Sequence, residues 1–232
     1  MVLSNLDQPE SSFPKDGEVS SHLSWYRIKG FSLFPLCKPM QGLPNSLHQV
    51  AGKFPKSFLL FLLSGCFPAN VWNRLMRRHL QSGQIAVRTG TRCDLIVLDV
   101  DPREGEPALP QHWDLPSTLT VITSRGYHLY FRPHCNVKYT PSSHDVIQRG
   151  LDVRADFGYV VAPPSTHPDG NLYRVKDFTV PMAELPLSVA LELKNCGAPR
   201  FRHVKKLWKN SWKIRWRVMK ANMRTPSQRL NS

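Results

Sequence analysis

The sequence lacks any long hydrophobic run. Its longest apolar stretch, Phe58 to Leu63, falls far short of the roughly 18 to 20 residues that a membrane-spanning helix requires, even when it is extended to Phe67. The first 21 residues also lack the basic and then apolar segments of a secretory signal. We therefore expect a cytoplasmic protein without a membrane-spanning segment.

Cysteine is also scarce. The five cysteines are odd in number and widely spaced, and no two form a Cys-x-x-Cys pair, so a disulfide framework is not expected. A zinc site would need converging ligands, and the nearest candidates in the sequence are His112, His134, Cys135 and His144. Because nine histidines and five cysteines can bring three such residues together by chance, we do not expect structural zinc.

Acidic residues are absent from the last part of the chain. Eleven of the 31 lysines and arginines lie from Arg200 onward, where there is no Asp or Glu, whereas the preceding part carries 20 basic against 17 acidic residues. Trp208, Trp212 and Trp216 recur every four residues, so a helix there would carry an apolar stripe beside cationic flanks. This pattern predicts binding to nucleic-acid phosphates through Lys205, Lys206, Lys209, Lys213, Arg215 and Arg217.

Two alternatives stay open for this basic segment: a structural helix that docks its tryptophans on the preceding domain, or a helix that lies on an anionic membrane surface. With 41% hydrophobic residues overall, the chain can bury one sizeable core. We expect a flexible leader at residues 1–20, one catalytic domain at residues 21–196 and a basic, tryptophan-containing tail at residues 197–232.

The expected domain is an α+β fold. Residues 22–29 are typical of a short helix that ends at Gly30, and a strand follows at residues 31–34, which Pro35 would end or move to a sheet edge. From Ile85 to Ala162, β-rich segments alternate with turns such as SRG and DFG. We therefore expect one mainly antiparallel central sheet with flanking helices.

Three further helices are expected. The apolar stripe in residues 71–81 predicts a helix that Asn70 can cap. The cluster at residues 58–63 favours a buried helix over a strand, because Leu and Phe dominate it and β-branched residues are absent. A short helix at residues 182–193 would close the domain.

The most informative segment is DLIVLDVDP, residues 94–102. Its apolar residues 95–98 predict a buried strand, and because strand side chains alternate, Asp99 and Asp101 project to one face. Two carboxylates on one face repel each other unless a cation lies between them, and Mg²⁺ prefers carboxylate oxygens. The alternative is that both aspartates solvate the strand end or cap the following turn.

Two later segments carry polar residues that suit the same site. His128 lies near the SRG turn in an otherwise apolar strand, where it can donate to a phosphate oxygen or, alternatively, bond to the backbone as a partly buried histidine. In GLDVRADFG, Asp152 and Arg154 share a face and offer one metal ligand and one phosphate clamp. Asp156 is expected to begin the turn that contains Gly158.

Three blocks, LIVLDVDP, SRGYHLYF and GLDVRADFGYVVAPPSTHPDG, resemble the motifs of the bifunctional primase–polymerase domain, a branch of the archaeo-eukaryotic primase superfamily. GFSLFPL and IAVRTG precede them in the expected order, and the resemblance covers about residues 22 to 190. It implies a primase-polymerase-like catalytic core in which Asp99, Asp101 and Asp152 bind metal ions and His128 contacts the nucleotide phosphates.

This resemblance implies a template-directed nucleotidyltransferase, a DNA primase and polymerase, with DNA template, primer and nucleoside triphosphates as substrates. Two divalent ions, Mg²⁺ or Mn²⁺, would stabilise the attacking and leaving oxygens as a 3′-hydroxyl attacks the α-phosphorus. Arg154 would neutralise triphosphate charge. Ser165 and His167 would contact sugar or phosphate, or else belong to a Pro-rich loop.

Some features depart from the family pattern. Arg125 stands where a small residue is usual, Phe157 stands where glycine is usual, and residues 37–70 match poorly. The sequence has no G-x-x-x-x-G-K-[ST] loop, so we expect a stand-alone catalytic module, a truncated relic of the family, or one half of a split system with a separate helicase; no membrane partner is expected. The alternative functions are a metal-dependent phosphodiesterase that uses the same carboxylates and a non-catalytic nucleic-acid binder.

Overall fold

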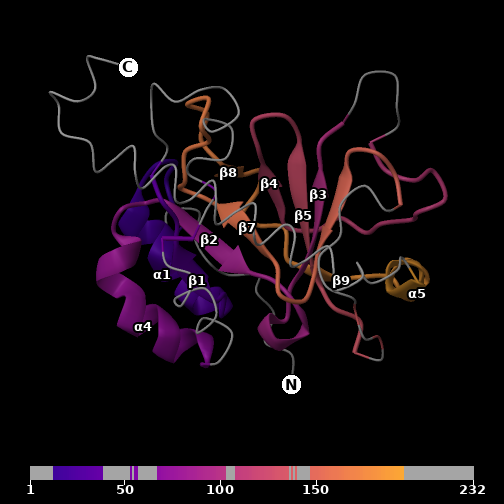
Figure 1. The fold of residues 1–232 in the computed structure, drawn as a ribbon, viewed down its shortest axis with the longest axis horizontal. Helices are drawn as coiled ribbons and strands as arrows, with labels where there is room; N and C mark the ends of the chain where they lie inside the picture. The colour runs from indigo at the N-terminus through magenta and orange to yellow at the C-terminus, as the bar shows by residue number, and fades with distance from the viewer. Residues whose placement is uncertain are drawn as a thin grey trace, which may run out of the picture.

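The computed structural model describes residues 13–38, 53, 55–56, 67–102, 108–135, 137, 139 and 147–195. The helices of this described part are α1 (Val19–Lys29), α4 (Ala69–Leu80) and α5 (Leu187–Asn195), with a short 3₁₀ turn at Thr91–Cys93 (Figure 1). The strands are β1 (Leu33–Pro35), β2 (Ile85–Arg88), β3 (Ile96–Val100), β4 (Thr120–Ile122), β5 (Tyr127–Arg132), β6 (Leu151–Arg154), β7 (Tyr159–Ala162), β8 (Arg174–Val175) and β9 (Ala183–Glu184). These elements confirm the α+β fold. Within these ranges, no helix has the length and apolar character needed to cross a membrane.

The larger sheet has six strands. Strands β6, β3, β5, β4 and β8 pair antiparallel in that order, and β9 pairs in parallel with the end of β5. Residues 95–98, in and just before β3, are fully buried, as the apolar run predicts. Because β3 lies between β5 and β6, its last residues have a neighbouring strand on each side.

The prediction of one sheet from Ile85 to Ala162 is wrong. Strands β1, β2 and β7 form a separate three-stranded antiparallel sheet, in which Ile85 pairs with Ala162. All four residues of β2 are buried, so the sequence pattern indicates burial but does not specify the partner strand. Among the described strands, β1 pairs with β2 and ends the strand order, which agrees with the prediction that Pro35 lies on an edge strand.

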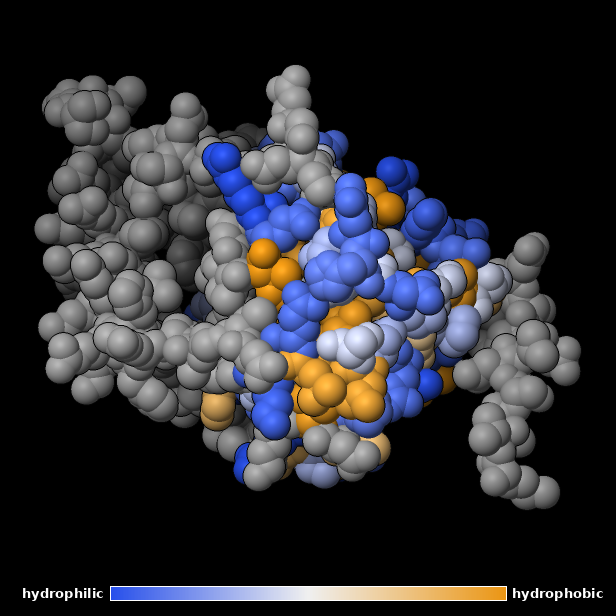
Figure 2. Space-filling model, turned by 90° about the vertical axis from the view of Figure 1, so that its right-hand side faces the viewer, coloured by the Kyte–Doolittle hydropathy of each residue, from blue (hydrophilic) through white to orange (hydrophobic). Residues whose placement is uncertain are grey.

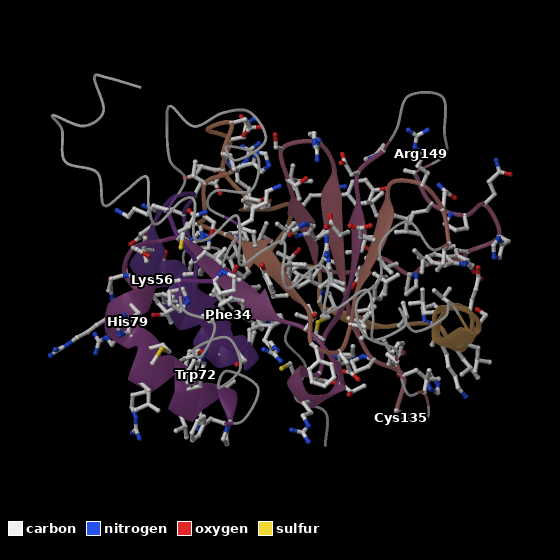
Figure 3. The ribbon with its side chains drawn as sticks, viewed as in Figure 1. Phe34, Lys56, Trp72, His79, Cys135 and Arg149 are labelled. Atoms are coloured by element: carbon white, nitrogen blue, oxygen red, sulfur yellow. The ribbon has the colours of Figure 1, made fainter. Side chains whose placement is uncertain are left out.

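Helices α1 and α4 lie beside the three-stranded sheet, on the left in Figure 1. Gly30 ends α1 in the left-handed conformation, with φ of 75°, as expected for the predicted turn. Trp72 and Phe34 are buried where α4 meets β1 (Figure 3). The Asn73 side chain accepts from the Leu33 amide at 3.0 Å and donates to a neighbouring carbonyl, so polar as well as apolar contacts join α4 to β1.

Three helix predictions differ in their limits. Helix α1 begins at Val19 instead of residue 22. Helix α4 begins at Ala69, with Pro68 in the capping position, so Asn70 lies in the first turn. Helix α5 begins at Leu187 instead of residue 182, because the backbone at residues 183–185 is hydrogen-bonded along β5. Figure 2, which views the molecule from the right of Figure 1, shows hydrophobic surface interspersed with hydrophilic surface on this face.

Several predicted segments lie outside the described residues: the first twelve residues of the leader, the predicted helix at 58–63, and the basic tail. The described end of the leader starts at Phe13, whose ring stacks on Phe178 with centroids 5.6 Å apart.

Candidate active site at the end of the six-stranded sheet

The register of three strands brings the acidic residues and His128 together. Asp99 in β3 lies directly opposite Asp152 in β6 on one side and opposite His128 in β5 on the other. Directly opposed residues of antiparallel strands project to the same face of the sheet. Accordingly, the His128 Nε2 atom lies 3.3 Å from an Asp99 carboxylate oxygen. Asp99 is therefore the centre of this group.

Arg154 joins the two opposed carboxylates. Its Nη2 atom donates to Oδ2 of Asp99 at 3.1 Å and to Oδ2 of Asp152 at 2.9 Å. Asp152 and Arg154 alternate with buried residues along β6, so they share a face, as the sequence pattern predicts. One nitrogen atom contacts both carboxylates, and the two acids therefore converge on a single cationic position.

Asp101 follows the last residue of β3. Its amide donates to the Gly150 carbonyl at 2.8 Å, and its carboxylate forms an ion pair of 2.9 Å with Arg125. Arg125 lies in the SRG turn between β4 and β5. A Cβ atom on the next residue, Gly126, would lie 2.0 Å from the Val100 carbonyl oxygen, so only glycine allows this turn to approach the end of β3.

These side chains line a pocket of about 480 Å³. Its wall holds three carboxylates, three lysine or arginine side chains and two histidines, and it also includes hydroxyl and aromatic groups. The main lining residues are Lys53, Asp99, Asp101, Ser124, Arg125, His128, Asp152, Arg154, Phe157, Tyr159, His167 and Tyr173. Such a mixture of acids and cations suits a ligand that carries both metal ions and phosphate groups.

The charges of the pocket stabilise ionised Asp99. Burial by itself would raise the pKa of Asp99, but the adjacent His128 and Arg154, through charge and hydrogen bonding, hold that pKa well below its usual range. The Nδ1 atom of His128 is buried and has no hydrogen-bond partner among the described residues. Burial, followed by the negative charge of Asp99, raises the pKa of Tyr173, so its hydroxyl stays protonated.

Lys53 is a pocket residue that the sequence did not reveal. It lies in the region that matches the family pattern poorly, which has no clear periodicity and therefore gave no signal. The Tyr159 hydroxyl donates to the Lys53 carbonyl at 2.9 Å and so fixes its backbone beside β7. Burial lowers the pKa of Lys53, and the charge of Arg125 lowers it further while Asp99 opposes this effect.

The structure does not bring Ser165 to the pocket. Ser165 is fully buried; its hydroxyl accepts from the Ile85 amide at 2.8 Å and donates to the Ile85 carbonyl at 2.9 Å.

His167, by contrast, lines the pocket, and its Nδ1 atom lies 2.8 Å from Asp169. Asp156 lies in the turn before Gly158, as predicted. The basic tail residues proposed for nucleic-acid binding are outside the described part.

Among the candidate zinc ligands, His112 lies apart from His134 and Cys135. His112 pairs with Glu192 at 3.0 Å, whereas His134 and Cys135 lie with Glu184, their ligand atoms within 4.8 Å of one another. This group lies at the other end of the sheet, as Figure 3 shows by the position of Cys135. His144 is not among the described residues.

An α+β domain with three carboxylates and several cations at one sheet end fits the class of metal-dependent enzymes that act on phosphates. The sequence matches the family of bifunctional DNA primase/polymerase N-terminal domains, Prim-Pol, over residues 24–188, and the chain belongs to this family. A comparison with curated proteins found no match. Family membership confirms the resemblance and supports a nucleotidyltransferase-type enzyme whose substrates are DNA and nucleotides.

Proposed function

We propose that this protein is a template-directed nucleotidyltransferase, a DNA primase and polymerase, with Asp99, Asp101 and Asp152 as the ligands of two divalent ions, Mg²⁺ or Mn²⁺. The observation that carries the proposal is the contact of one Arg154 nitrogen with both Asp99 and Asp152. Two carboxylates that already converge on one cationic point, with a third in the same pocket, form a donor set that fits hard divalent ions. When bound, such ions lower the pKa of an attacking hydroxyl and neutralise phosphate charge.

The cationic side chains would hold the triphosphate. Lys53 and Arg125 line the same pocket as the carboxylates, and Arg154 can exchange its carboxylate partners for phosphate oxygens. A guanidinium group binds phosphate through two parallel hydrogen bonds, and a lysine binds it as a point charge. His128 lines the pocket on the adjacent strand, and its Nε2 atom, 3.3 Å from Asp99 here, would donate a hydrogen bond to a phosphate oxygen in place of this carboxylate.

Two residues receive other roles in this proposal. Ser165 supports the backbone of β2, because both of its hydrogen bonds are made to Ile85. His167 lies at the pocket wall and would contact the sugar or a phosphate. The basic tail, with Lys205 and its cationic neighbours, stays a predicted contact to the DNA backbone, and a helicase stays a predicted separate partner.

Incubation with primed circular single-stranded DNA tests the proposed reaction. The full chain is supplied with deoxynucleotides or ribonucleotides and with Mg²⁺ or Mn²⁺, and a parallel sample contains labelled DNA without triphosphates. We expect metal-dependent incorporation of nucleotides and intact DNA in the parallel sample. Cleavage of that DNA without incorporation would instead identify a phosphodiesterase, and tight DNA binding without either reaction would identify a non-catalytic binder.

A further inference from the structure

Phe157 is an exposed aromatic side chain in the wall of the pocket. It is 74% exposed, the highest value among the large hydrophobic residues of the described part, and it lines the pocket beside charged and polar groups. Single exposed hydrophobic residues are common on proteins, so exposure alone does not identify a binding residue. Its backbone conformation supplies a second observation.

The backbone of Phe157 is strained. Its φ angle is 59°, in the left-handed region, and the other described non-glycine residue with positive φ is Asp94, a residue type that tolerates this conformation. A bulky aromatic residue in this region is an outlier that persists only where the surrounding structure enforces it. Glycine would relieve the strain and would lose little packing, because the ring contributes little buried surface.

The neighbouring residues enforce the conformation. The Asp156 carboxylate accepts hydrogen bonds from the Thr91 amide at 2.8 Å and from its hydroxyl at 3.0 Å. A Cβ atom on Gly90 would lie 2.6 Å from an Asp156 carboxylate oxygen, so the two loops are in close contact. The turn is therefore fixed just before Phe157, and the ring is presented at the pocket without packing against a core.

We propose that Phe157 is a base-stacking residue, on which a nucleobase lies when the phosphates of the same ligand occupy the pocket. This inference rests on the proposed function. Lys53, Arg125 and Arg154 supply the cations for phosphate groups, and Phe157 supplies an apolar face at the same wall. Every nucleobase has a π-face that stacks on an aromatic ring, so the interaction needs no particular base.

Three variants of the full chain test the proposal by direct binding. Phe157→Gly removes the ring and relieves the left-handed strain, Phe157→Trp keeps an aromatic face, and Leu75→Ala removes an exposed apolar side chain from α4, outside the pocket. We expect Phe157→Gly to weaken binding of base-containing ligands about 5- to 140-fold, with an unchanged or higher melting temperature. Phe157→Trp should restore the affinity, and Leu75→Ala should leave it unchanged.

Ligands that lack a base show whether the stacked base belongs to the incoming nucleotide or to the DNA strand. If the base belongs to the incoming nucleotide, Phe157→Gly weakens binding of a nucleoside triphosphate but not of inorganic tripolyphosphate. If it belongs to the DNA strand, the variant weakens binding of oligothymidylate but not of an abasic strand of equal length. Equal losses for base-free ligands, or unchanged affinity for all ligands, would overturn the proposal.

The binding measurement needs no turnover, so its outcome is separate from that of the incorporation assay. A chain that binds bases through Phe157 but incorporates no nucleotide would overturn the proposed function and leave the stacking role standing. A wild-type chain that binds no base-containing ligand would overturn both.

Discussion

The two sheets use their polar side chains in different ways. At the end of the three-stranded sheet, the side chain of Gln84, just before β2, bonds both the amide and the carbonyl of Thr166, and the side chain of Ser165, just after β7, does the same for Ile85. In the six-stranded sheet, Asp99 and Asp152 face a pocket and are balanced by a side chain, Arg154. Side chains that bond a buried backbone amide and carbonyl stabilise the fold, whereas charged groups paired with other side chains can exchange those partners for a ligand.

Outside the carboxylates, the largest loss of triphosphate affinity is expected for a substitution of Lys53. This substitution tests whether the cationic side chains of the pocket bind phosphate. Lys53→Met should weaken triphosphate binding by about 1.5–3 kcal/mol, roughly 12- to 140-fold, because it removes a charge-assisted hydrogen bond without shortening the side chain. Titration calorimetry with a nucleoside triphosphate measures the change. Lys56→Met is the matched control, since Lys56 (labelled in Figure 3) is exposed and is not among the residues that line the pocket. Equal effects of the two substitutions would contradict a specific role for Lys53.

Ser165 provides the opposite test, because it supports the end of the three-stranded sheet at Ile85 and does not line the pocket. Ser165→Ala should lower the free energy of unfolding by about 1–3 kcal/mol, because the buried Ile85 amide loses its hydroxyl acceptor. Nucleotide affinity should not change. Urea unfolding and nucleotide binding measured on the same variant distinguish the two roles. Lower nucleotide affinity with unchanged stability would return Ser165 to the ligand site.

A smaller effect is expected at Arg125, which pairs with Asp101 at 2.9 Å while its side chain is 62% exposed. Exposed ion pairs contribute only about 0.2–1 kcal/mol, so Arg125→Ala should raise divalent-ion affinity about 1.4- to 5-fold by removing a competing cation. The affinity is measured without nucleotide. Arg174→Ala removes an arginine that contacts Asp16 away from the pocket, and it should have no effect. Weaker ion binding by Arg125→Ala would show that this arginine supports the metal site instead of competing with it.

The acidic face was predictable from the sequence because its signal is local. The apolar residues 95–98 indicate a buried strand, and alternation places Asp99 on a definite face. The same alternation of side chains places Asp152 and Arg154 on one face of β6. The family resemblance, over about residues 22 to 190, added the order of the motifs and is confirmed by the match over residues 24–188.

The remaining features depend on contacts between distant segments. Nothing local specifies that β2 pairs with β7 in a second sheet, because a strand buried on both faces shows no preferred partner. The same limit applies to Ser165, whose neighbours in sequence do not reveal that its hydroxyl bonds to Ile85. Lys53 reaches the pocket through a segment without periodicity, held there by the Tyr159 hydroxyl.

Manganese binding followed by electron paramagnetic resonance tests the central claim, that the pocket carboxylates hold the divalent ions. With a nucleoside triphosphate present, the wild-type chain should bind about two Mn²⁺ ions, and Asp99→Asn and Asp152→Asn should each lose at least one of them while circular dichroism shows a retained fold. Asp114→Asn, a substitution of an exposed aspartate outside the pocket, should bind as the wild type does. Unchanged Mn²⁺ stoichiometry and affinity in both pocket variants would contradict the claim.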